Sequence, residues 1–300
     1  MKAKISIVIN TYNEEVNLTR ALKSVKWADE IIIVDMHSTD KTIDLAKKAK
    51  AKVFYHPYTR FVEPARNFAI AKASGDWILV LDADEEIPPT LSRELMRIAN
   101  SETPISFIEI ARVNMIFGKW MQASNWWPDY NIRFFKTGAV VWDSAIHSKP
   151  KTLGVGMELP PDAHLSITHY NYSSVSHFVS RMERYSDIQA EELWKKDIKF
   201  NYLDLINKPL EEFLSRFFAG KGYEDGVHGL ALSLLQAFSF LLVYLKLWEK
   251  GKFRKNEIDL KKIRQVTRES QEDLSYWFKF STLSKNPIKR LFQRAKNKLI

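Results

Sequence analysis

The sequence predicts an α/β protein, in which a mostly parallel sheet is flanked by helices and followed by a C-terminal helical appendage. Short apolar, β-branched runs alternate with amphipathic stretches over the first hundred residues, as in parallel sheets with helical crossovers. Polar or acidic clusters follow three of these runs. From Ser174 onward the pattern is helical, with segments near 174–195, 209–219, 229–249, 257–276 and 287–299.

The first hundred residues contain four strand-like runs. They lie at 5–10, 30–35, 52–55 and 76–81. Their continuous apolar character is typical of parallel strands that are covered on both faces. Helices are expected over 18–25, 42–50 and 65–73, and another begins at Pro88-Pro89, because proline suits the first helical turn. Longer, aromatic-rich strands follow at 105–117, 131–138 and 164–172.

The net charge of +9 is concentrated near the C-terminus. Residues 246–300 hold 16 Lys/Arg and 6 Asp/Glu, whereas the other 245 residues hold 29 and 30. A basic region beside apolar helices favours an anionic membrane surface as partner. Nucleic acid is not expected, because no nucleic-acid-binding motif accompanies the charge. The absence of cysteine excludes disulfides, thiolate metal sites and a cysteine nucleophile. The N-terminus resembles no secretory signal, so we expect a cytoplasmic protein.

The three polar clusters mark the expected site, because ligands of open α/β sheets bind beyond the carboxyl ends of strands. The clusters are 11–15, 35–40 and 82–84. The sequence contains neither a GxGxxG after the first strand nor a P-loop, which disfavours dinucleotide oxidoreductases and P-loop enzymes. Asp82 and Asp84 share a face if the chain is extended, and their oxygens suit Mg²⁺ or Mn²⁺. A solvated turn is the alternative.

Several segments resemble glycosyltransferase family 2. They are ISIVINTYNEE, IIIVDMHSTDKT and ARNFAIAKASGDWILVLDADEE in the first hundred residues. Further segments resemble the subgroup of lipopolysaccharide-core β-glucosyltransferases: GKW, WWPDYNIRFFKTG, AIH, ITHYNY and EDGVHGL. The resemblance implies an inverting enzyme with the Rossmann-like GT-A fold. One departure is Ser148, which stands where the subgroup commonly has glutamate after histidine.

The resemblance implies a donor site for a nucleotide diphosphate sugar, with a UDP-sugar favoured. The predicted donor-binding residues are Thr11, Tyr12, Asn13, Glu14, Asp35, Ser38, Arg66, Asp82 and Ala83. Asp35 would accept a hydrogen bond from uracil N3–H, and Arg66 would face the base or the diphosphate. Helix capping by Ser38 and Asp40 is an equal alternative, and Arg66 could instead form a surface ion pair.

The metal ligands and the general base are the remaining roles. Asp82 would lie by the ribose and the metal, and Asp84 would be the principal ligand of Mg²⁺ or Mn²⁺. Asp129 is the candidate base that takes the acceptor proton, because it lies in a tryptophan-rich loop four residues before Arg133. Its rivals are Asp143 and His147, and a loop-solvated or capping role is the alternative. His169 is a candidate metal ligand, although a structural histidine is the more frequent outcome.

The appendage is expected to bind a membrane surface. Residues 229–245 carry no charge, but this stretch is shorter than a bilayer span, so a buried or interfacial helix is expected. Residues 285–298 carry six basic and no acidic side chains beside an apolar stripe, typical of an interfacial helix; packing on the protein is the alternative. We assign 1–200 to catalysis and 201–300 to membrane association.

The sequence therefore predicts a cytoplasmic enzyme, peripheral on the inner face of the cell membrane. It would transfer a sugar from a nucleotide diphosphate donor to a lipid-linked or cell-envelope glycan. One alternative is transfer to a polyprenyl phosphate, whose oxygen is already ionised and needs no base. The other is a nucleotide-sugar-binding membrane adaptor that has lost turnover.

Overall fold

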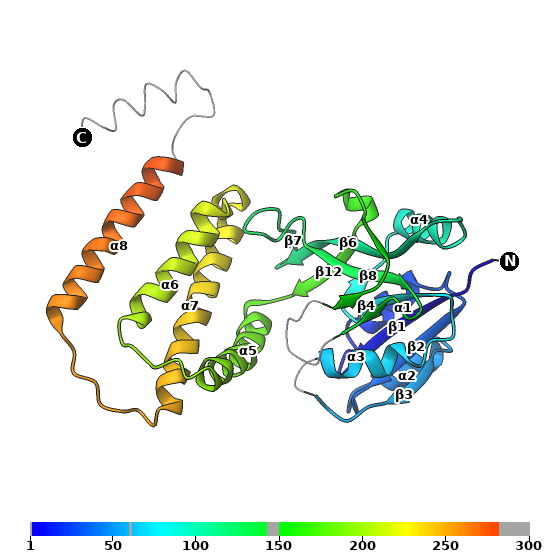
Figure 1. Ribbon diagram of the computed structural model, residues 1–300, viewed down its shortest axis with the longest axis horizontal. Coiled ribbons are helices and arrows are strands. Elements are labelled where there is room, and N and C mark those ends of the chain that lie inside the picture. Colours follow the sequence, from blue (N-terminus) through cyan, green and yellow to red (C-terminus); the bar gives the residue numbers. More distant parts are fainter. Residues whose placement is uncertain (1, 60–61, 143–149, 282–300) are drawn as a thin grey trace, which may run out of the picture. The chain divides into compact units, whose positions relative to one another are not determined.

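The computed structural model describes residues 2–59, 62–142 and 150–281 (Figure 1). Packing divides the chain into two compact units. The sheet unit comprises Met1–Trp120 and Trp126–Asn171, and the helical unit comprises Met121–Asn125 and Tyr172–Ile300. The expected functional boundary near residue 200 lies within the helical unit and stays a prediction, because packing does not report which residues take part in catalysis.

The sheet unit is built on a mixed sheet with the order β3-β2-β1-β4-β8-β6-β12-β5. The first four strands in this order are parallel, whereas β8 runs antiparallel to both β4 and β6. The strands are β1 (Ile5–Thr11), β2 (Glu30–Asp35), β3 (Lys52–Tyr55), β4 (Trp77–Asp82), β5 (Glu85–Glu86), β6 (Ile105–Ile116), β8 (Tyr130–Lys136) and β12 (Ile167–Tyr172). The predicted α/β class is confirmed.

Shorter strands complete the sheet unit. Both β7 (Lys119–Trp120) and β11 (Val155–Glu158) pair with β6, and β9 (Val140–Val141) pairs with β10 (Lys151–Thr152). The helices are α1 (Leu18–Ser24), α2 (Thr42–Lys48), α3 (Glu63–Ile70) and α4 (Pro89–Ala99), with a 3₁₀ turn at Ala163–Leu165.

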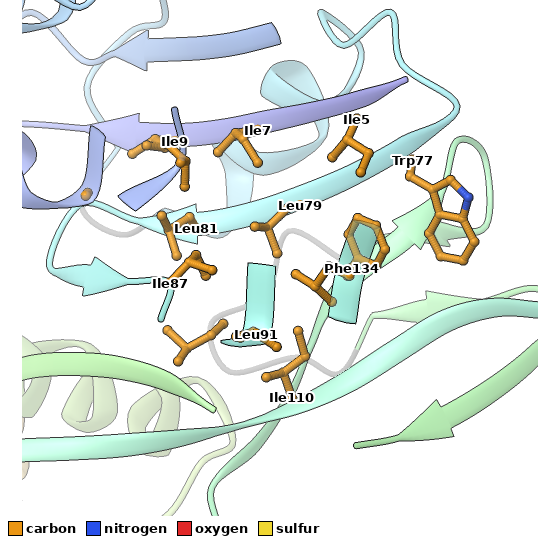
Figure 2. Packing of buried hydrophobic residues seen from close by; sticks show 14 of the residues in the cluster. Ile5, Ile7, Ile9, Trp77, Leu79, Leu81, Ile87, Leu91, Ile110 and Phe134 are labelled. Carbon is orange, nitrogen blue, oxygen red and sulfur yellow. The ribbon is translucent and has the colours of Figure 1, made fainter. Parts of the chain in front are cut away.

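The apolar runs of the strands are buried on both faces of the sheet. On one face, alternate residues of β1 pack with β4, α1 and α4 (Figure 2). On the other face, Val8 packs with Ile32 and Val34 of β2 and with Ala69 of α3. This two-sided burial explains why β1, β2 and β4 read as continuous apolar runs, and their polar residues follow where the strands end.

The helical unit contains α5 (Val175–Lys195), α6 (Asp204–Leu214), α7 (Val227–Lys250) and α8 (Leu260–Ser281). A π-helical turn at Ser215–Ala219 and a 3₁₀ turn at Gly222–Asp225 join α6 to α7, and α7 packs against both α5 and α6. Gly229 is required at the start of α7, because a Cβ atom there would lie 1.8 Å from the Gly222 carbonyl oxygen.

The EDGVHGL segment at 224–230 closes the helical unit around residues 121–125. The Asp225 carboxylate is buried and its Oδ2 atom accepts hydrogen bonds from the backbone N–H groups of Gln122 at 3.0 Å and Ala123 at 2.8 Å. Ser124 donates its backbone N–H to the Gly220 carbonyl at 2.7 Å. These bonds give the later sequence motif a structural role.

Helix α7 is longer than the charge-free stretch that predicts it. Its 24 residues are long and apolar enough to cross a membrane by length and composition, and 28% of its most apolar window is buried. The expected interfacial helix at 285–298 lies outside the described residues.

Candidate active site

Three strand ends bring the predicted donor-binding residues together. In the sheet register Thr11 of β1 lies opposite Asp35 of β2, and Asn10 lies opposite Asp82 of β4. The carboxyl ends of these neighbouring parallel strands therefore form one edge, as their polar clusters predict.

Asp35 anchors the loop that follows β2. Its side chain is fully buried and accepts hydrogen bonds from the Thr11 hydroxyl at 2.8 Å, the Ser38 backbone N–H at 2.7 Å and the Ser38 hydroxyl at 2.5 Å. Both carboxylate oxygens are thus engaged. Its contact with a nucleobase stays a prediction, and it holds Thr11 and Ser38 in place.

The loop after β1 is fastened to the loop after β2. Asn13 donates its backbone N–H to the Ser38 hydroxyl and accepts the Thr39 N–H, both at 2.8 Å. Asn13 has a left-handed φ of 55°, which asparagine tolerates better than most residues. Glu14 donates its backbone N–H to the Thr42 hydroxyl at 2.8 Å. The two loops therefore form one pre-organised rim.

Asp40 contributes to the same rim. Its carboxylate accepts the backbone N–H of Thr42 at 2.9 Å and that of Glu15 at 3.0 Å. Burial tends to raise the pKa of Asp40, but these bonds to Thr42 and Glu15 lower it. Asp40 thus bonds the N–H of the first residue of α2, but the N-cap residue of that helix is Lys41, which makes no side-chain capping bond.

Aromatic residues of the two rim loops pack against aromatic residues at the end of β3 and in the loop after it. Tyr12 packs against Tyr58 with ring centroids 4.5 Å apart, and His37 stacks on Tyr55 at 5.6 Å. The three tyrosines remain 39–50% exposed. Sequence reasoning found Tyr12 but missed the other three. Tyr55 ends β3 and Tyr58 follows it, and these aromatic residues at the third strand end were the available signal. Exposed flat rings can stack on a nucleobase.

The acidic triplet 82–84 does not continue as an extended chain. Asp82 ends β4, and Ala83 and Asp84 form a turn before β5. The prediction that Asp82 and Asp84 share one face assumed an extended chain, and it is wrong because the chain turns at Ala83 and Asp84. Asp82 is bonded to Arg66 and Arg133 at 3.1 and 2.7 Å, whereas Asp84 lies beside His169.

Asp82 is held as a carboxylate by arginines. Arg66 engages Oδ1 and Arg133 engages Oδ2. Burial alone would raise the pKa of Asp82, but the charges of Arg133 and Arg66 hold it well below its usual range. Because both oxygens are already bonded to arginines, Asp82 is poorly suited to hold a metal.

Glu85 is a buried member of this network that sequence reasoning did not single out. Its side chain is fully buried, accepts a 2.7 Å hydrogen bond from Arg133 and accepts the Asp82 backbone N–H at 2.8 Å. Burial raises the pKa of Glu85, against the opposing charge of Arg133. Glu85 is the first of the two glutamates in DADEE, and only the structure shows that this one, rather than Glu86, is buried.

Asp129, the predicted base, belongs to the same polar network. Its Oδ2 atom lies 2.6 Å from Arg112 Nη2 and accepts Asn114 Nδ2 at 3.0 Å. Arg112 Nη1 also lies 3.6 Å from Glu85 Oε1. A chain of charges therefore runs from Asp82 through Arg133, Glu85 and Arg112 to Asp129, and links the two predicted carboxylates. The base role stays a prediction.

His169 has a fixed orientation. Asn114 donates its amide N–H groups to Trp126 O at 2.9 Å and to Asp129, so its Oδ1 atom is the acceptor that faces His169 Nδ1 at 2.7 Å. His169 Nδ1 therefore carries the hydrogen. Its Nε2 atom lies 3.5 Å from Asp84 Oδ2, and strand pairing sets His169 opposite Glu85.

Asp84 and His169 are the candidate ligands for the predicted Mg²⁺ or Mn²⁺, and their metal role stays a prediction. The carboxylate oxygen suits either ion, and the hydrogen bond to Asn114 orients the ring as outer partners of metal-binding histidines do. No group of three or more potential side-chain ligands is arranged for a metal among the residues described. A two-ligand site of this kind leaves the other positions to phosphate oxygens and water.

Residues of α3 contact Trp142, which follows β9. The Arg66 guanidinium lies 5.6 Å from the ring centre of Trp142. Asn67 forms two hydrogen bonds with the Trp142 backbone at 2.7 and 2.9 Å. The rival bases Asp143 and His147, together with Ser148, lie outside the described residues.

Comparisons with known proteins identify relatives of this chain. A family model described as Glycosyl transferase family 2 matches residues 6–155. The chain is 31% identical over 259 residues to an uncharacterized glycosyltransferase of Rickettsia typhi, covering 82% of this chain and 87% of that protein. A lipopolysaccharide core biosynthesis glycosyltransferase of Rhizobium meliloti is 22% identical, covering 83% and 93% of the two chains.

A solved structure also matches part of the chain. It is glucosyl-3-phosphoglycerate synthase from Mycobacterium tuberculosis, with 24% identity and a TM-score of 0.33 over 37% of this chain and 44% of that chain.

Proposed function

Because the chain belongs to glycosyl transferase family 2, we propose that it transfers a sugar, with inversion, from a UDP-sugar to a lipid-linked or cell-envelope glycan. That the chain is a glycosyltransferase acting on a nucleotide sugar follows from the family. The observation that supports a metal-dependent donor site is the Asp84–His169 pair, which lies at the carboxyl edge of the parallel strands. Asn114 supports this pair through its hydrogen bond to His169.

The donor would lie across the rim formed by the loops after β1 and β2. The exposed rings of Tyr12, Tyr55 and Tyr58 offer stacking surface for the base. Arg66 is mostly buried and paired with Asp82. It would contact the ribose or the diphosphate. The rim needs little rearrangement, since hydrogen bonds already fasten both loops, and this lowers the entropic cost of binding.

Asp84 and His169 would hold the divalent cation. When bound, such a cation neutralises negative charge on the leaving diphosphate. The protein contributes the placement of both ligands, because strand pairing fixes His169 and its bond to Asn114 fixes the tautomer. Asp82 contributes by keeping Arg66 and Arg133 at the same edge.

The acceptor hydroxyl must lose its proton as it attacks the anomeric carbon, and Asp129 is the proposed base. A name among the relatives supports the acceptor class, since the Rhizobium meliloti protein is called a lipopolysaccharide core biosynthesis enzyme. The bonds of Asp129 Oδ2 to Arg112 and Asn114 must loosen before that oxygen can take a proton.

Those bonds favour a second candidate, transfer to a polyprenyl phosphate. The oxygen of a phosphate acceptor is already ionised, so no base is needed. Asp129 would then serve only to hold Arg112 and Asn114. The two candidates differ in the acceptor alone and share the donor site.

The proposed location is the cytoplasmic face of the cell membrane, where the protein binds peripherally. Sequence charge supports it, since residues 285–298 carry six basic and no acidic side chains, and each basic side chain near an anionic leaflet contributes about 1 kcal/mol.

A screen of nucleotide diphosphate sugars tests the donor proposal. Purified protein is incubated with each sugar nucleotide and Mn²⁺, and release of the nucleotide diphosphate is measured. We expect hydrolysis of one or a few UDP-sugars and none in EDTA. Hydrolysis of GDP-sugars alone would overturn the UDP assignment, and hydrolysis unaffected by EDTA would overturn the metal assignment.

A further inference from the structure

The helical unit exposes apolar side chains at one end, and exposes others along α5, along α7 and around the start of α8. Val227 at the start of α7 is 80% exposed, and Tyr276 and Phe278 near the end of α8 are 60% and 55% exposed. Within this unit, α7 begins and α8 ends on the same side, at the upper end in Figure 1. We call this surface the aromatic end; its residues are Tyr223, Val227, Leu230, Tyr276, Phe278 and Phe280.

Aromatic contacts join these residues into one surface. Phe218 of the π-helical turn packs against Trp277 and Phe278 of α8, with ring centroids 6.2 and 5.0 Å apart. Its neighbour Phe217 packs against Tyr223 at 6.1 Å. The π-helical turn is therefore the common support on which the end of α8 and the start of α7 meet.

The last turns of α8 expose aromatic rings around the helix rather than along one stripe. Tyr276 and Phe280 share a face and stack at 6.1 Å, whereas Phe278 lies about 160° away from Phe280 at 100° per residue. All three are at least 44% exposed. A helix that docks on another protein buries one stripe, whereas partly exposed rings on two opposite sides, one of which also contacts Phe218, suit a bilayer interface, where aromatic side chains concentrate.

The charge of the sequence around and after the aromatic end indicates which partner this surface binds. From Leu274 to Ile300 the sequence has seven basic and no acidic residues, and the exposed residue Lys279 lies within the aromatic end. A second copy of this chain would bring the same positive charge and be repelled. An anionic lipid surface offers both the opposite charge and an apolar layer for the rings.

We propose that the aromatic end enters the headgroup layer of an anionic bilayer, so that the helical unit docks by this end. The inference deepens the membrane association proposed above and rests on it. The first turns of α7 enter with Val227 and Leu230, while Leu232 and Leu247 stay buried in the helical unit. In this proposal α7 enters only by its first turns and does not span the bilayer, although 28% of its most apolar window is buried.

A matched pair of variants tests the proposal. Val227 and Leu260 are the first residues of α7 and α8, are 80% and 75% exposed, and receive the same change to glutamate. An acidic side chain suits a helix start, so both variants should fold. Leu260 lies 18 residues before Phe278, about 27 Å along the helix, well beyond an insertion depth of about 5–10 Å.

The measurement is co-sedimentation of the full chain with vesicles of phosphatidylcholine alone or with 30% phosphatidylglycerol, at low and high salt. We expect Val227→Glu and Phe278→Glu to weaken binding to the anionic vesicles by about tenfold or more, because a charge replaces an inserted apolar group. Leu260→Glu should bind as the parent does. Donor hydrolysis, measured without vesicles, should be unchanged in all three variants.

Several outcomes would overturn the proposal. Parent-like binding by Val227→Glu and Phe278→Glu would exclude the aromatic end. Equal weakening by Leu260→Glu would mean that α8 lies along the membrane. Protein that stays with the vesicles in high salt and alkaline carbonate would indicate a spanning α7. Tyr276→Ser, which adds no charge, serves if Phe278→Glu does not fold. A parent chain that binds the anionic vesicles but hydrolyses no UDP-sugar would count against the proposed enzyme function alone.

Discussion

His169 Nε2 lies 3.5 Å from Asp84 Oδ2, while His169 Nδ1 is held 2.7 Å from Asn114 Oδ1. The buried Asn114 amide thus positions the His169 ring, whose other nitrogen faces the Asp84 carboxylate. The same Asn114 donates to Asp129, so the proposed metal site and the proposed base share one support.

The first prediction concerns this support. Asn114→Ala should raise the Mn²⁺ concentration needed for half-maximal donor hydrolysis by about 10–100-fold, because His169 loses the partner that fixes its tautomer. Excess Mn²⁺ should restore most of the rate. A lower maximal rate at unchanged half-saturation would contradict the positioning role.

The second prediction concerns Asp129. Asp129→Asn should reduce the rate of transfer to acceptor by about 10²–10⁴-fold, since it removes a proton transfer in the transition state. Affinity for UDP should change little, as measured by calorimetry. An unchanged transfer rate would move the role to Asp143 or His147, or favour the polyprenyl-phosphate acceptor.

The third prediction concerns the buried charges around Arg133. Arg133→Met removes the buried arginine that Asp82 and Glu85 share, while Arg66 stays beside Asp82 and Arg112 stays 3.6 Å from Glu85. We expect a loss of about 3–5 kcal/mol in the free energy of unfolding, because two buried carboxylates would lose the arginine that bonds both of them. Urea unfolding followed by circular dichroism measures it. Arg97→Ala, which breaks an exposed pair with Glu94, should cost no more than about 1 kcal/mol; equal losses would contradict the account.

The fourth prediction concerns Glu30, at the end of the sheet opposite the site. Burial would raise its pKa, but hydrogen bonds from Lys52, Ser6 and Ser74 lower the pKa of Glu30 to about 2. A lowered pKa stabilises the fold above the unfolded value of 4.5, and this stability is lost as pH falls from 4.5 toward 2.

Glu30→Gln should therefore lower the free energy of unfolding at pH 7 by about 1–3 kcal/mol. Its difference from the parent should shrink as pH falls below 4.5. Urea unfolding at several pH values measures both. Glu102→Gln, at an exposed carboxylate, is the control and should behave as the parent; a pH-independent difference for Glu30→Gln would refute the assignment.

The sequence predicted the elements whose patterns are local. The strands at 30–35 and 52–55 match β2 and β3 at both ends, because their apolar runs are bounded by polar residues. Asp35 and Asp82 were found since they end such runs. The helices α5 and α7 overlap the segments 174–195 and 229–249 that were predicted to be helical.

The long-range polar contacts could not be read in this way. Asp82 meets Arg133, 51 residues later, and Asn114 meets His169, 55 residues later. Nothing in the local pattern distinguishes the buried Glu85 from the partly exposed Glu86 beside it. The turn at 83–84 also broke the alternation assumed for the acidic triplet, since β4 ends at Asp82.

Donor hydrolysis by Asp84→Asn, measured with Mn²⁺ and with EDTA, tests the central claim most directly. The account predicts that the parent enzyme hydrolyses its UDP-sugar only with the metal. It also predicts that Asp84→Asn loses the activity by orders of magnitude while its circular dichroism spectrum and urea unfolding stay those of the parent, because the leaving diphosphate loses its neutralising charge. Full activity of the parent in EDTA, together with parent-like turnover by Asp84→Asn, would contradict it.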